Sequence, residues 1–78
     1  MLRTKYEREV SNYFLDNGEL TFDLHVAIEG LVFTGGVPVT GDHYLSPDDV
    51  HVWGILNHVV VYNIEGNLLN VFAVMPVN

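Results

Sequence analysis

The stretch GDHYLSPDDVH, residues 41–51, gathers side chains that could hold a divalent metal ion or exchange protons. Its candidate ligands are Asp42, His43, Asp48, Asp49 and His51. Imidazole and carboxylate groups are ligands that zinc and manganese accept in proteins. A small metal- or ligand-binding domain centred on the two histidines is therefore one hypothesis for this chain.

The spacing of these residues argues against a metal site. Adjacent residues such as Asp48 and Asp49 point to opposite faces of a strand, and the alternating oxygen ligands of a calcium loop are missing. Ser46 followed by Pro47 and two acids is instead typical of a helix start. We therefore predict one short helical turn here, with no metal, no cofactor and no catalytic residue.

Charge is distributed very unevenly along the chain. The formal net charge is −7, and the only basic residues are Arg3, Lys5 and Arg8. Of the ten Asp and Glu residues, all but Glu7 come after residue 8. Nucleic-acid binding depends on Lys and Arg contacts with phosphates, so we expect neither direct nucleic-acid binding nor membrane binding. A basic protein surface is the partner that this charge favours.

Length and composition indicate one small domain, residues 1–78. A core of this size is marginally stable alone, and the absence of cysteine excludes disulfides as reinforcement. We therefore expect a homo-oligomer, most simply a homodimer. The first ten residues lack the apolar stretch of a secretory signal, so the expected location is cytoplasmic, or the host cytoplasm if the protein is encoded by a phage.

The N-terminal third allows two interpretations. Residues 4–16 have a possible capping box at Thr4 and Glu7 and an apolar stripe at helical spacing, which favours a helix ending near Gly18. Asp-Asn-Gly at 16–18 is also a strong hairpin turn signal, which would make this segment a strand. We prefer the helix and keep the hairpin as the alternative.

Residues 20–29, LTFDLHVAIE, alternate between apolar and polar types. Such alternation is typical of a strand that is buried on one face. The alternation shifts by one residue at Gly30, which indicates a bulge or bend. This segment is therefore predicted as a strand with Asp23 and Glu29 on its polar face.

The rest of the chain is predicted as a loop followed by three strands. Residues 34–47 are rich in Gly and Pro and form the natural functional loop. The runs 50–56, 58–64 and 68–75 read as strands, the last two as a hairpin around Glu-Gly-Asn, with Pro76 ending the last strand. Residues 68–75 are apolar in both phases, so both of their faces should be covered, one of them by the N-terminal helix or a second subunit.

These patterns predict an α+β fold, with an N-terminal helix packed on a small antiparallel sheet. An all-β meander with the Asp-Asn-Gly hairpin at its N-terminus is the alternative. The aromatic residue most open to a partner is Tyr44 in the long loop, whereas Trp53 is expected in the core.

The leading functional hypothesis is a small acidic, non-enzymatic protein-interaction module. Small acidic proteins of phages and mobile elements that block nucleic-acid-binding host proteins share this size and composition, so an inhibitor of that kind is included. The alternatives are an assembly protein that acts as an oligomer and the metal- or ligand-binding domain. The predicted partner-binding residues are Asp23, Glu29, Asp42, Tyr44, Asp48 and Asp49.

Overall fold

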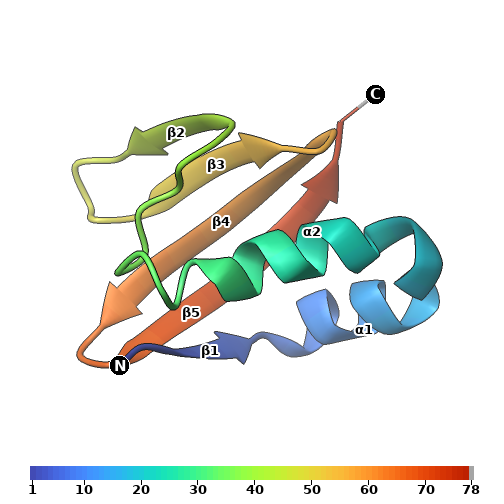
Figure 1. The fold of residues 1–78 in the computed structure, drawn as a ribbon, viewed down its shortest axis with the longest axis horizontal. Coiled ribbons are helices and arrows are strands. Elements are labelled where there is room, and N and C mark those ends of the chain that lie inside the picture. Colours follow the sequence, from blue (N-terminus) through green and yellow to red (C-terminus); the bar gives the residue numbers. More distant parts are fainter. Residues whose placement is uncertain (78) are drawn as a thin grey trace.

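A computed structural model describes residues 1–77 of the chain, which form a mixed sheet with two helices on one face (Figure 1). The elements in chain order are β1 (Arg3–Tyr6), α1 (Arg8–Asp16), α2 (Gly18–Gly30), β2 (Asp42–Leu45), β3 (His51–Ile55), β4 (His58–Glu65) and β5 (Leu68–Pro76). The strand order across the sheet is β1-β5-β4-β3-β2. The fold is therefore α+β, as predicted. The sheet is mixed, because β1 pairs in parallel with β5, whereas a purely antiparallel sheet was predicted.

Strands β2 to β5 form an antiparallel meander, since each pairs with the next along the chain. The three predicted C-terminal strands are confirmed, including the hairpin around Gly66 and the end of β5 at Pro76. A bulge in β5 opposite Val61 and Tyr62 leaves Phe72 without a partner. These strands could be predicted from the sequence because β-branched residues, which favour strands, occur on both of their faces.

The first element is a strand and not the start of a helix. Thr4 lies in β1, which pairs in parallel with β5, and α1 begins only at Arg8. Glu7 precedes the helix without a side-chain cap, so the expected capping box is wrong. The parallel ladder with β5 and the hydrogen bonds of Thr4 and Tyr6 to α2 outweigh the helical propensity of these residues.

The predicted strand over residues 20–29 is wrong, because this segment belongs to α2. Thr21, Leu24 and Ile28 face the sheet and are almost fully buried, at a spacing that one side of a helix provides. Asn17 joins α1 to α2 in place of the alternative hairpin, and Gly30 is the last residue of α2 and no bulge.

Residues 31–41 lead from α2 to the far edge of the sheet, and two hydrogen bonds fix their course. The Tyr62 hydroxyl donates to the Gly36 carbonyl at 2.7 Å, and the Trp53 indole N–H donates to the Thr40 carbonyl at 2.8 Å. Strand β2 then occupies part of the predicted loop. The predicted helical turn at 46–49 is instead a β-turn closed by an Asp49 N–H to Ser46 carbonyl bond of 3.0 Å.

The core lies between the helices and the helix-facing side of the sheet. Its buried residues are Val10, Leu24, Ile28, Leu31, Trp53, Val60, Tyr62, Leu69 and Val71. Trp53 is 2% exposed, which confirms its expected place in the core. Within residues 1–77, no helix has the length and apolar character that crossing a membrane requires.

Candidate functional site

Helix α2 carries apolar side chains on the face that points away from the sheet. Phe22 is 66% exposed and Val26 is 55% exposed, although both stand on the same helix as fully buried Leu24. Phe33, just beyond the helix, is 80% exposed. A helix that is apolar on all sides is normally buried on all sides, so this face has the composition of a contact surface.

Two hollows that share His25 connect most of the exposed apolar residues on this side of the molecule. His25, Val26 and Phe33 line an open hollow of about 400 Å³, together with Glu29 and Gly30. A second hollow of about 340 Å³ is lined by Tyr6, Ser11, Phe14, Leu15 and again His25. We call Leu15, Phe22, His25, Val26 and Phe33 the outer α2 surface.

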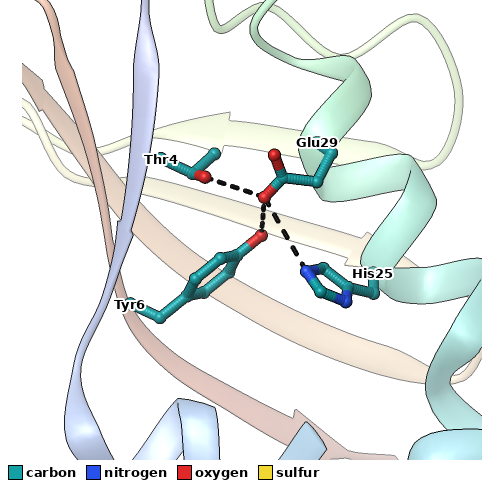
Figure 2. A network of polar contacts seen from close by, with 4 residues as sticks. All are labelled: Thr4, Tyr6, His25 and Glu29. Atoms are coloured by element: carbon teal, nitrogen blue, oxygen red, sulfur yellow. Dashed lines mark hydrogen bonds and ion pairs between the residues drawn. The ribbon is translucent and has the colours of Figure 1, made fainter.

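A carboxylate stands at the border of this surface and holds three side chains around it (Figure 2). Glu29 Oε2 accepts hydrogen bonds from the hydroxyl groups of Thr4, at 2.7 Å, and Tyr6, and it lies 3.8 Å from His25 Nε2. Burial, and then the bond to Glu29, raise the pKa of Tyr6 well above its usual range. The phenol therefore stays protonated and keeps donating, so the network ties β1 to α2.

His25 stands at the junction of the two hollows. Its ring stacks on Phe14 with centroids 4.8 Å apart and meets the edge of Tyr6 at 5.4 Å. The imidazole is exposed, so its polar atoms can bond to a partner while its face extends the apolar strip. This combination suits recognition, because a polar group inside an apolar surface fixes the orientation of what binds there.

Acidic residues lie close to the outer α2 surface in the sequence and on the same two helices. Asp16, Glu19 and Asp23 are exposed on α1 and α2, and Glu29 is half-buried beside His25. No Lys or Arg follows residue 8 in the sequence, so His25 is the only side chain of α2 that can carry a positive charge. The surface is thus an apolar strip with a negative rim.

The structure divides the predicted partner-binding residues between two places. Asp23 and Glu29 belong to α2, whereas Asp42 and Tyr44 lie on β2 and face away from the helices. Asp48 and Asp49 occupy the turn between β2 and β3, and Tyr44 is 61% exposed. The six residues therefore do not form one surface, and sequence reasoning missed the strip formed by Leu15, Phe22, Val26 and Phe33.

The two histidines of the opening stretch contact each other. His43 Nε2 lies 2.8 Å from His51 Nδ1, and the His51 ring stacks on Tyr62 with centroids 4.6 Å apart. One nitrogen of each ring is thus engaged in a mutual hydrogen bond. In the part of the chain that the structure describes, no group of three or more His, Asp or Glu side chains converges as metal ligands.

The histidine pair leads to a prediction about acid stability. Burial, and then the neighbouring His43, lower the pKa of His51 below its ordinary 6.5. The unfolded chain therefore takes up this proton first, so the free energy of unfolding decreases as the pH falls from about 6.5. Denaturant titrations between pH 7 and 5 should show this loss, and His51→Phe, which keeps the stack on Tyr62, should reduce it. An identical pH dependence in both proteins would assign the loss to another group.

No protein-family model, no curated protein and no solved structure matches this chain.

Proposed function

We propose that this protein is a small, acidic, non-enzymatic module that binds another protein through the outer α2 surface. The observation that carries the proposal is the composition of α2, which presents Phe22 and Val26 to solvent opposite the buried Leu24. Exposed apolar side chains of this size oppose solubility unless a partner covers them. The Thr4 and Tyr6 hydroxyl groups that contact Glu29 hold β1 against α2, so this network has a structural role beside the surface.

The charge around this surface specifies the chemistry of the partner. Asp16, Glu19 and Asp23 form the rim, and an apolar centre with a charged rim is the usual anatomy of a protein interface. The complementary partner surface presents apolar side chains surrounded by Lys or Arg. Nucleic-acid-binding proteins display such basic surfaces, so the proposal includes an inhibitor of a protein that handles nucleic acid.

A synthetic helix can test this surface without a known partner. The probe is an 18-residue peptide with Leu at positions i, i+3, i+4 and i+7 of each repeat and Lys elsewhere, about 27 Å long when helical. We expect Phe33→Asp to weaken its binding at least about tenfold in calorimetric titrations, because the substitution places a charge in the apolar hollow that Phe33 lines. A peptide with Glu in place of Lys should bind far more weakly.

The matched control is Leu56→Asp, which also adds a carboxylate at an exposed leucine but lies in the turn between β3 and β4. This control should bind the Lys peptide as tightly as the original protein does. Equal weakening by Leu56→Asp and Phe33→Asp, or no weakening by either, would contradict the proposed surface, because acidity alone would then account for the binding.

A further inference from the structure

The middle of the sheet face opposite the helices is also apolar and is uncovered by residues 1–77, whereas Asn63 and Asn70 make one end of that face polar. The register places Tyr44, Val52, Val61 and Ala73 side by side in one row across four neighbouring strands. The next row holds Asp42 at the edge of the sheet, followed by Gly54, Val59 and Met75. A sheet face in contact with water normally carries polar residues at these positions, so this composition is typical of a covered face.

The two edges of this open face carry opposite charges, basic along β1 and acidic at the turn between β2 and β3. Arg3 and Lys5 alternate with the helix-facing Thr4 on β1, so they belong to the open face at one edge of the sheet. The turn with Asp48 and Asp49 lies at the other edge, beyond the point where His51 pairs with Tyr62. The start of β1 and the connection between β2 and β3 lie at the same end of the sheet (Figure 1).

A second copy of the chain can cover the apolar part of the open face and also pair its oppositely charged edges. A two-fold axis parallel to the strands turns two sheets face to face and reverses the strand order of one relative to the other. The basic β1 of one copy then lies opposite the acidic β2–β3 turn of the other, and this contact occurs twice. Val61, on the central strand β4, lies at the axis and meets the Val61 of the partner copy.

We propose that two copies of this chain form a symmetric dimer through the open sheet face, with Arg3 and Lys5 of each opposite Asp48 and Asp49 of the other. The net charge of −7 opposes the association of two copies, so an arrangement that places Arg3 and Lys5 opposite acidic residues is electrostatically favoured. The dimer leaves both outer α2 surfaces exposed and is independent of their proposed function.

A charge-swap experiment tests this dimer by sedimentation equilibrium. The original protein should be a dimer at micromolar concentration. Arg3→Glu with Lys5→Glu should raise the dissociation constant at least tenfold, and adding Asp48→Lys and Asp49→Lys to that variant should restore the dimer. All of these side chains are exposed, so circular dichroism should show unchanged folding.

Two further variants distinguish the surfaces. The chain lacks cysteine, so Val61→Cys gives one thiol per copy, which a short bismaleimide should cross-link into covalent dimers. Val26→Asp on α2 should leave the dimer intact. A monomeric original protein, a dimer lost through Val26→Asp, or a charge swap that fails to restore association would each overturn the inference.

Discussion

Leu24→Ala is expected to lower the free energy of unfolding by about 2–5 kcal/mol, the range for truncating a large buried aliphatic side chain. Leu24 is 1% exposed and lies in the core with Ile28 and Tyr62. Removing most of its side chain leaves a cavity between α2 and the sheet. Urea titration followed by circular dichroism measures the loss directly.

Val26→Ala is the matched control, two residues further along the same helix. Val26 is 55% exposed, so its truncation should change the free energy of unfolding by less than about 0.5 kcal/mol. Equal losses at both positions would mean that Leu24 and Val26 share one buried face, as in a strand. That result would contradict both α2 and the outer α2 surface.

This pair also shows why sequence reasoning failed over residues 20–29. Thr21, Leu24 and Ile28 provide the helical spacing, but the additional apolar residues Phe22 and Val26 create an alternating pattern. Alternation then fits a half-buried strand better than a helix with one apolar face. The residues that obscured the helix are the ones that form the proposed binding surface. Conflicts between pattern and structure of this kind are expected at functional sites.

Gly41→Ala is expected to destabilise the protein by about 3 kcal/mol. Gly41 has φ +81°, where a side chain costs about 1–2 kcal/mol, and a Cβ atom would overlap the Gly54 carbonyl oxygen. It would also lie 2.9 Å from the Trp53 indole nitrogen, which donates to the Thr40 carbonyl. Loss of that hydrogen bond adds about 1 kcal/mol. Thermal unfolding followed by Trp53 fluorescence measures the effect.

Gly35→Ala separates backbone strain from steric overlap. Gly35 has φ +68°, but a Cβ atom there would meet nothing within 4 Å. Its substitution should therefore cost only about 1–2 kcal/mol, from the left-handed conformation alone. A loss at Gly41 no larger than the loss at Gly35 would show that β2 does not approach β3 as closely as the register requires.

The sequence predicted the C-terminal strands well, but it did not predict β1 or the turn between β2 and β3. The segments that form β3, β4 and β5 have strand-favouring residues at both odd and even positions. They therefore show no helical spacing that could suggest another structure. Ser46 and Pro47 satisfy a tight β-turn as readily as a helix start, and only the pairing of β2 with β3 decides between them. The parallel pairing of β1 depends on β5, more than 60 residues away, which no local pattern records.

The outer α2 surface could not be derived from residue types alone. Leu15 and Phe33 lie outside α2 in the sequence, and the two hollows that meet at His25 bring them into one strip. The acidic composition did indicate a basic partner, and that expectation stays a prediction. The signal that could have revealed the surface is the excess of apolar residues on a segment that also has helical spacing.

The proposed dimer and the proposed partner surface lie on opposite sides of the molecule (Figure 1). If both proposals hold, the dimer carries two outer α2 surfaces that face away from each other. Such an arrangement binds a repeated or dimeric partner with higher avidity than a single copy does.

Site-specific photo-cross-linking in the cells that carry this gene tests the central claim most directly. A photoreactive phenylalanine analogue is placed at Phe33, within the outer α2 surface, and in a second strain at Leu56 as the control. The account predicts a light-dependent adduct with one defined protein from position 33, none from position 56, and loss of the adduct when Val26→Asp is added. The absence of any adduct from position 33, or the same adducts from both positions, would contradict the claim that this surface binds a partner.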